Sequence, residues 1–78
     1  MSGLTLDAKI AYLMFELADE QGELDFKMNR EELADYLGTT RPSLSRSLMK
    51  FKKEGYIQIQ KSKVKILDFD SLEEICHK

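Results

Sequence analysis

The chain has 78 residues and a formal net charge of -2; with 33% charged and 42% hydrophobic residues it has the balance of one small folded domain, not of a disordered segment. No apolar run approaches the roughly 20 residues that a membrane span needs, and no secretory signal precedes the first predicted helix. Because Cys76 is the only cysteine, an internal disulfide is excluded, and we expect a cytoplasmic protein.

The first predicted helix begins at Thr5, a residue type that caps the first backbone N–H groups of a helix. Asp7 follows in the first turn, where the helix dipole favours an acid. Apolar residues then recur at helical spacing and predict one buried stripe, made of Leu6, Ile10, Leu13, Met14 and Leu17. The acids at the end of this helix and just after it are expected to form a solvated face or a contact surface for a partner protein; they are Glu16, Asp19, Glu20 and Glu23.

A polar turn and a short strand are predicted next. Residues 19–22 end the helix, and Gly22 is able to take a left-handed conformation there. Leu24 and Phe26 then alternate with polar neighbours, which is the pattern of a half-buried strand.

The second predicted helix has signals at both ends. Asn29 begins it and Glu32 lies three residues on, so each side chain can accept a hydrogen bond from the other residue's backbone N–H, as in a capping box. Gly38 ends the helix in a left-handed conformation. The apolar side is predicted to contain Leu33, Tyr36 and Leu37.

The third predicted helix covers about residues 41–54 and follows a tight turn at residues 39–40. Pro42 lacks a backbone N–H and fits only the first turn, so Thr40 or Arg41 caps the helix. Gly55 follows its end. Two helices joined by such a turn are the layout of a helix-turn-helix, whose second helix enters the major groove of DNA.

A helical projection of residues 41–54 separates two faces. The core stripe consists of Leu44, Leu48 and Phe51, and the opposite face consists of Pro42, Ser45, Arg46, Met49 and Lys53. An ordinary solvated face would explain this stripe, but not the absence of acids from residue 41 to residue 53 or the short hydroxyls beside arginine. Arginine can bond guanine O6 and N7, serine can meet several base edges, and a helix N-terminus can bind phosphate. We therefore predict base contacts from Arg41, Ser43, Ser45 and Arg46.

After Gly55, apolar and polar residues alternate in residues 57–60 and again in residues 63–66, which is the pattern of β-strands. The two segments predict a hairpin with its turn at Lys61 and Ser62. The turn lacks the usual Asn-Gly or Gly signal. The predicted fold is mostly α with a small antiparallel hairpin (α+β), a winged helix-turn-helix that occupies the whole of residues 1–78.

The hairpin lysines have two interpretations: they could discourage edge-to-edge aggregation or contact the DNA backbone as a wing. Because these lysines lie as a group beside a predicted recognition helix, we favour contact with the DNA phosphates. The lysines near residue 50 could likewise interact with the helix dipole or with phosphate. The predicted phosphate contacts from this reasoning are Lys50, Lys61 and Lys63.

The C-terminal segment predicts a short helix and no reactive site. Asp70 is expected to cap it, with Glu73 completing a capping box, and Leu72 and Ile75 are expected to pack on the core. Adjacent Cys76 and His77 lack further partners for a metal site. No nucleophile with a base and no paired carboxylates occur, so we expect neither an enzyme nor a cofactor in this chain.

Positive charge is concentrated in the middle of the chain. Residues 26–53 hold seven Lys or Arg and three acids, whereas residues 1–25 hold one Lys and six acids. Screening confines electrostatic fields to about 10 Å, so the local sign matters more than the total for a polyanionic partner. The acidic total still argues against strong non-specific binding. The acidic face at the end of the first predicted helix is expected to be turned away from DNA.

The segment from residue 29 to residue 57, NREELADYLGTTRPSLSRSLMKFKKEGYI, resembles the DNA-binding region of the Crp/Fnr family of bacterial transcription regulators. In that family an R-x-x-[IL]-A/G-x-x-[IL]-G segment precedes the recognition helix, and E-G-[LY]-I leads into the wing. The resemblance extends from Leu6 to about Ile75 and includes the closing D-x-x-x-L-E-E-I stretch.

The resemblance implies several properties of the site and its partners. Arg41, Ser45 and Arg46 match the base-contacting helix, and Thr40 matches a phosphate-contacting position in the turn. Pro42 departs from the family, where many members carry a glutamate that accepts a hydrogen bond from cytosine N4, so we expect a different half-site. The family's regulators are homodimers with an N-terminal effector domain, which imply an inverted-repeat DNA site and contact with RNA polymerase. We expect that effector domain to be absent from this chain and the fragment to be monomeric.

A second hypothesis comes from another class of function. The basic face could meet an acidic protein, making the domain a winged-helix protein-interaction module. Binding to random duplex DNA at low salt discriminates the two, because only a DNA-binding domain loses such affinity steeply as salt rises.

Overall fold

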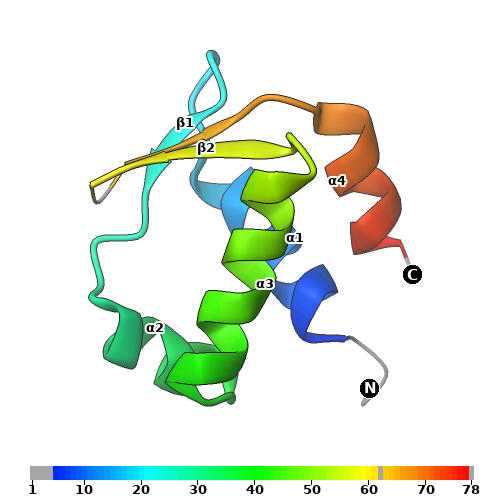
Figure 1. Cartoon of the computed structure of the whole chain (residues 1–78). Helices are drawn as coiled ribbons and strands as arrows, with labels where there is room; N and C mark the ends of the chain where they lie inside the picture. Colours follow the sequence, from blue (N-terminus) through cyan, green and yellow to red (C-terminus); the bar gives the residue numbers. More distant parts are fainter. Residues whose placement is uncertain (1–4, 62, 78) are drawn as a thin grey trace.

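The computed structural model describes residues 5–61 and 63–77. These residues form α1 (Leu6–Leu17), β1 (Glu23–Asp25), α2 (Arg30–Leu37), α3 (Arg41–Lys53), β2 (Ile57–Gln60), β3 (Lys63–Ile66) and α4 (Phe69–Cys76) (Figure 1). The predicted α+β class with three helices before an antiparallel hairpin is confirmed. None of the helices in the described residues is long and apolar enough to cross a membrane.

The sheet has three antiparallel strands in the order β1-β3-β2. The predicted hairpin is confirmed, with Gln60 opposite Lys63 next to the turn. Lys61 takes the left-handed conformation (φ 55°) that glycine usually supplies, and Ser62 lies outside the described residues. β1 adds a third strand on the far side of β3, a pairing that the sequence analysis did not predict.

Three of the predicted helix caps are confirmed and one is wrong. Thr5 caps α1, and Asn29 forms the capping box of α2. α4, however, begins after Asp68, not after Asp70, so the predicted capping box is absent there. Thr40 caps α3, which settles the alternative left open above.

The Asp68 cap is explained by its bonds with Ser71. The backbone N–H of Ser71 donates to one carboxylate oxygen (3.1 Å) and its hydroxyl donates to the other (2.8 Å). These bonds favour the ionised carboxylate and hold the pKa of Asp68 below its ordinary value of 3.8. Asp70 lies within the first turn of α4, one residue after the helix begins, so it is not at the N-cap position.

Apolar side chains from every element meet in one core. The largest that are fully buried are Ile10, Met14, Leu33, Leu44, Phe51, Ile57, Val64, Ile66 and Leu72. Ile75 packs against the core, as predicted, and Phe26 is buried although it lies beyond the end of β1.

Two residues assigned to buried stripes are exposed. Leu17, in the last turn of α1, is 42% exposed, and Tyr36 is 66% exposed. In α2 the small side chain of Ala34 is buried beside Leu33 and Leu37, which turns Tyr36 outward. α1 buries Ile10, Leu13 and Met14 of its predicted stripe, and it also buries Ala8 and Ala11 because it packs against α4 as well as against the rest of the core.

Gly22 occupies a position that a larger residue cannot fill without strain. Its φ is +79°, and a Cβ atom would lie 2.7 Å from Cζ of Phe69 and 3.3 Å from the Ile66 carbonyl oxygen. We expect Gly22→Ala to lower the free energy of unfolding by about 2–4 kcal/mol, the sum of left-handed strain and a steric clash. Urea unfolding measures this loss.

The matched control is Gly55→Ala. Gly55 has a similar φ of +81°, but no atom beyond its neighbours in the chain lies within 4 Å of its Cβ position. We expect this variant to lose only the backbone contribution, about 1–2 kcal/mol. Equal losses in the two variants would show that the contact with Phe69 contributes nothing.

Candidate nucleic-acid interface

α3 lies at the surface of the domain, with one side buried against the core. Leu44, Leu48 and Phe51 are buried in the core, which confirms the predicted stripe. At the N-terminus the Thr40 hydroxyl accepts a hydrogen bond from the Ser43 backbone N–H (3.3 Å) and donates one to Ser43 Oγ (3.0 Å). The helix is therefore fixed in both position and starting point.

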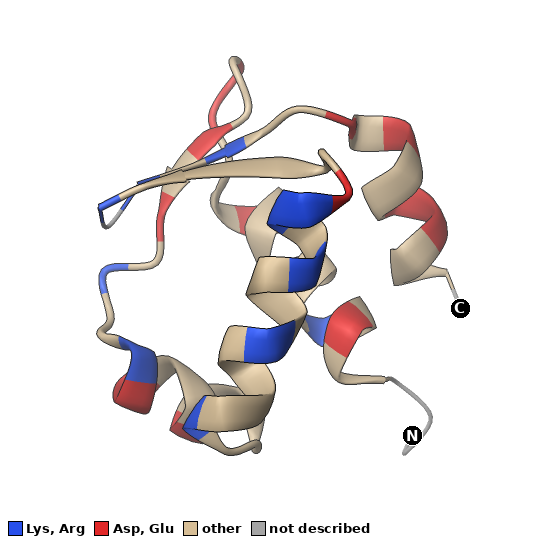
Figure 2. Ribbon diagram, viewed as in Figure 1, with Lys and Arg blue, Asp and Glu red and all other residues tan. Residues whose placement is uncertain are grey.

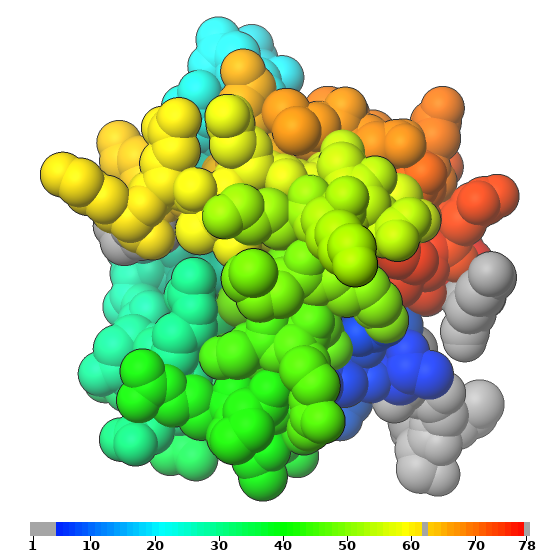
Figure 3. All heavy atoms as spheres, viewed as in Figure 1, coloured from blue at the N-terminus to red at the C-terminus, as the bar shows by residue number. Residues whose placement is uncertain are grey.

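The opposite side of α3 is an exposed, basic surface. The sequence from Arg41 to Lys53 contains no acid, and Figure 2 shows Lys and Arg at successive turns of α3. In the space-filling view of the same side, α3 crosses the middle of the molecule between the β2–β3 hairpin and α1 (Figure 3). We define the outer face of α3 by its exposed residues other than Lys50, which faces α1; they are Arg41, Pro42, Arg46, Met49, Lys52 and Lys53.

The predicted base-contacting residues are not equally accessible. Arg41 and Arg46 are exposed, whereas Ser43 and Ser45 are half-buried on the flanks of the helix. The Ser43 hydroxyl is also engaged by Thr40. Ser47 is buried. The arginines are therefore the side chains best placed to reach a ligand.

Met49 is an outer-face residue that the sequence analysis did not propose as a site residue. Its side chain is 58% exposed although it is large and apolar. It lies three positions after Arg46, on the same side of α3. The helical projection had already placed Met49 opposite the core stripe, so the signal was present in the sequence.

The wing lysines lie near acids that the sequence order does not reveal. Lys63 and Lys65 are exposed and alternate with buried residues along β3. Through the β1–β3 pairing, Asp25 lies opposite Lys63 and Glu23 lies opposite Lys65. Lys61 is exposed in the turn, beyond the end of this pairing. Of the three lysines, Lys61 is thus the least offset by neighbouring acids.

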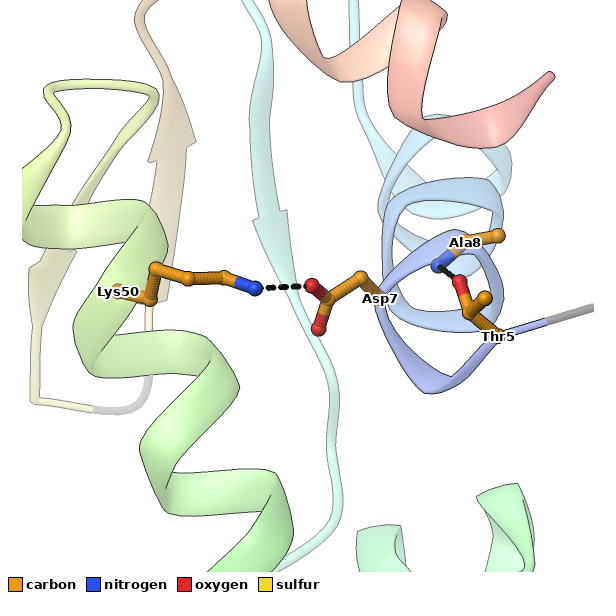
Figure 4. Close-up of polar contacts among 4 residues, drawn as sticks. All are labelled: Thr5, Asp7, Ala8 and Lys50. Carbon is orange, nitrogen blue, oxygen red and sulfur yellow. Dashed lines mark hydrogen bonds and ion pairs between the residues drawn. The ribbon is translucent and has the colours of Figure 1, made fainter. Parts of the chain in front are cut away.

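Lys50 has a specific partner on another helix. Its ammonium forms an ion pair with the Asp7 carboxylate at the start of α1 (Figure 4). Lys50 is exposed at the side of α3 that faces α1, and not in the centre of the outer face.

Among the described residues, no group of three or more His, Cys, Asp or Glu could hold a metal ion.

Comparisons with known proteins agree with this geometry. The chain is 36% identical over 53 residues to the transcriptional regulatory protein Btr of Bordetella pertussis, covering 68% of this chain and 22% of Btr. It is 30% identical over 73 residues to the nitrogen fixation regulation protein FixK of Rhizobium meliloti, covering 88% of this chain and 35% of FixK. The chain therefore spans a minor part of these regulators.

A solved structure gives the same result in three dimensions. The crystal structure of a CRP-family transcriptional regulator from Thermus thermophilus superposes with a TM-score of 0.79 at 28% identity, covering 97% of this chain and 42% of that one. The model of the Crp-like helix-turn-helix domain matches residues 8–75. This is a family of transcription regulators and not of enzymes. The chain belongs to the Crp-like helix-turn-helix domains, the DNA-binding domains of CRP/FNR-family transcription regulators.

Proposed function

We propose that the outer face of α3 enters the major groove of double-stranded DNA and reads its sequence. The observation that carries this proposal is an exposed, acid-free helix face beside a hairpin, on a helix whose other side is fixed in the core. Arg41 and Arg46 are the primary base contacts, since arginine recognises guanine through two parallel hydrogen bonds. Ser43 and Ser45 make secondary contacts from the flanks.

Two apolar residues of the same face influence which bases are read. Met49 is exposed three positions after Arg46, and an apolar side chain in the major groove favours the methyl group of thymine. Pro42 has neither a donor nor an acceptor in its side chain. It offers no hydrogen bond to a base, so the base pair next to it is read by shape and contact alone.

Phosphate contacts surround this helix on both sides. We assign them to Thr40 at the N-terminus of α3, to Lys50 at its side and to Lys61 and Lys63 in the wing. Backbone N–H groups at a helix N-terminus and exposed lysines are common phosphate ligands, and they position a protein on DNA without reading sequence.

In the intact regulator we propose a homodimer that binds an inverted repeat, because two copies of one reading helix recognise two symmetric half-sites. Sensing of an effector and contact with RNA polymerase would then involve parts of the regulator outside these 78 residues or surfaces other than α3. The chain alone acts as a monomeric half-site binder in the bacterial cytoplasm, without a cofactor.

Lys61→Gln tests the wing. Lys61 is exposed and lies beyond the acids of β1, so removing its charge should remove one phosphate contact. We expect weaker binding to every duplex alike, and a plot of log affinity against log salt that is shallower by about 0.9. Fluorescence anisotropy with selected and random duplexes measures both quantities.

Lys63→Gln is the matched comparison, and we expect a smaller effect because Asp25 lies opposite Lys63. If the wild-type chain fails to bind random duplex at low salt, the DNA-reading assignment of α3 is wrong and a protein partner becomes the better hypothesis.

A further inference from the structure

A single lysine of α3 is held by an acid from a distant part of the chain. The Lys50 ammonium pairs with Asp7, which lies in the first turn of α1, 43 residues earlier (Figure 4). Within residues 5–61 and 63–77 this is the only ion pair. The other basic residues of α3 form no ion pair with any described acid. Lys50 is therefore distinguished from them by its partner.

The ion pair is a poor candidate for holding α3 in place. The side chain of Lys50 is 55% exposed and that of Asp7 is 24% exposed, and exposed pairs contribute little to stability. α3 is already anchored by the buried side chains of Leu44, Leu48 and Phe51. The main consequence of the pair is therefore the neutralisation of one positive charge at the edge of the DNA-binding surface.

We infer that Asp7 lowers the affinity of this domain for DNA by occupying the ammonium group of Lys50. The inference rests on the proposed function, in which Lys50 contacts a phosphate. A carboxylate and a phosphate oxygen are both anions and compete for the same ammonium. DNA binding must break the Asp7–Lys50 pair and leaves the Asp7 carboxylate close to a like-charged backbone. Asp7 thus competes with DNA phosphates for the Lys50 ammonium, and it lowers the affinity for every DNA sequence alike.

The surroundings of Lys50 identify Asp7 as the acid that matters. Lys50 borders a pocket of about 430 Å³ that is lined by Thr5, Asp7, Glu54, Tyr56 and Ile75. Glu54 is the second acid there, but it forms no ion pair with Lys50. Removal of the Asp7 charge should therefore release the Lys50 ammonium, whereas acids elsewhere in the chain have no such link.

The test is Asp7→Asn, which keeps the side-chain shape and removes the charge. We expect the variant to bind random duplex about two- to fivefold more tightly at low salt, since one exposed ion pair no longer competes. The slope of log affinity against log salt should stay close to that of the wild type, because Lys50 neutralises one phosphate in both complexes. Fluorescence anisotropy over a salt series gives both values.

Asp70→Asn is the matched control. Like Asp7, Asp70 is an aspartate in the first turn of a helix. Asp70 lies at the start of α4, whereas the α4 residue that lines the Lys50 pocket is Ile75, near the end of the helix. We expect little change in affinity and none in slope. In a Lys50→Gln background, Asp7→Asn should give no larger gain than Asp70→Asn. Circular dichroism verifies that each variant is folded.

The outcomes separate this inference from the function on which it rests. If Arg46→Ala weakens binding but Asp7→Asn leaves it unchanged or weaker, α3 binds DNA and Asp7 does not compete with phosphate. A gain that persists in the Lys50→Gln background likewise overturns the inference. If the wild-type chain does not bind duplex at all, the proposed function fails, and the inference fails with it.

Discussion

Arg46→Ala is expected to lose about 1–3 kcal/mol of binding free energy on a preferred duplex while changing binding to random DNA much less. The side chain of Arg46 is exposed on the outer face of α3, and the exposed side chain of Met49 lies one turn further along. Arginine makes two hydrogen bonds to guanine, so its removal should relax discrimination at one base pair. Competition binding with single-base-pair variants of the duplex measures this loss.

Arg46→Lys is the matched control for charge. Lysine keeps the positive charge but lacks the planar fork of arginine, so we expect discrimination to fall while the salt dependence is retained. Equal weakening of specific and random duplexes by Arg46→Ala would contradict the base-reading role and reassign Arg46 to the phosphates.

Phe51→Ala is expected to produce the largest loss of stability, about 3–5 kcal/mol. Phe51 is 0% exposed and its ring lies 6.1 Å from that of Tyr56, so α3 loses a large buried contact when the ring is removed. Small domains have only about 5–15 kcal/mol of stability in total, and a loss of this size is a large fraction of it. Urea unfolding followed by circular dichroism gives the value.

Met49→Ala provides the comparison on the same helix. Met49 is two residues away but 58% exposed, so we expect a change in stability within about 0.5 kcal/mol. If the two variants lose similar stability, the division of α3 into a buried and an outer face is wrong. Phe51→Leu, which keeps most of the apolar volume, should lie between them.

Local signals account for most of what the sequence predicted correctly. Thr5, Asn29, Thr40 and Gly38 act on backbone groups within a few residues, so their roles can be read directly from sequence. The same is true of the α3 core stripe and the β2–β3 hairpin, whose periods of 3.6 and 2 are local properties. The Asp68 cap is an exception, because two acids close together each fit a helix start.

Contacts between distant segments could not be predicted in this way. The pairing of β1 with β3 places Asp25 opposite Lys63, and the Asp7–Lys50 pair joins residues 43 positions apart. Neither leaves a periodic pattern in the sequence. Both alter the electrostatics of the interface: a predicted wing lysine lies opposite an acid, and a predicted phosphate contact has a partner. Tyr36 illustrates the same limit for packing, since only the folded arrangement shows that Ala34 occupies the inner side of α2.

The central claim is that the outer face of α3 reads DNA sequence, and selection from a random duplex library tests it most directly. The wild-type chain and Arg46→Ala would be used in parallel, with bound duplexes sequenced after each round. We predict that the wild-type chain enriches a short motif containing guanine and that Arg46→Ala loses the preference at one position of that motif. Enrichment of the same motif by both proteins, or of none by the wild-type chain, would contradict the claim.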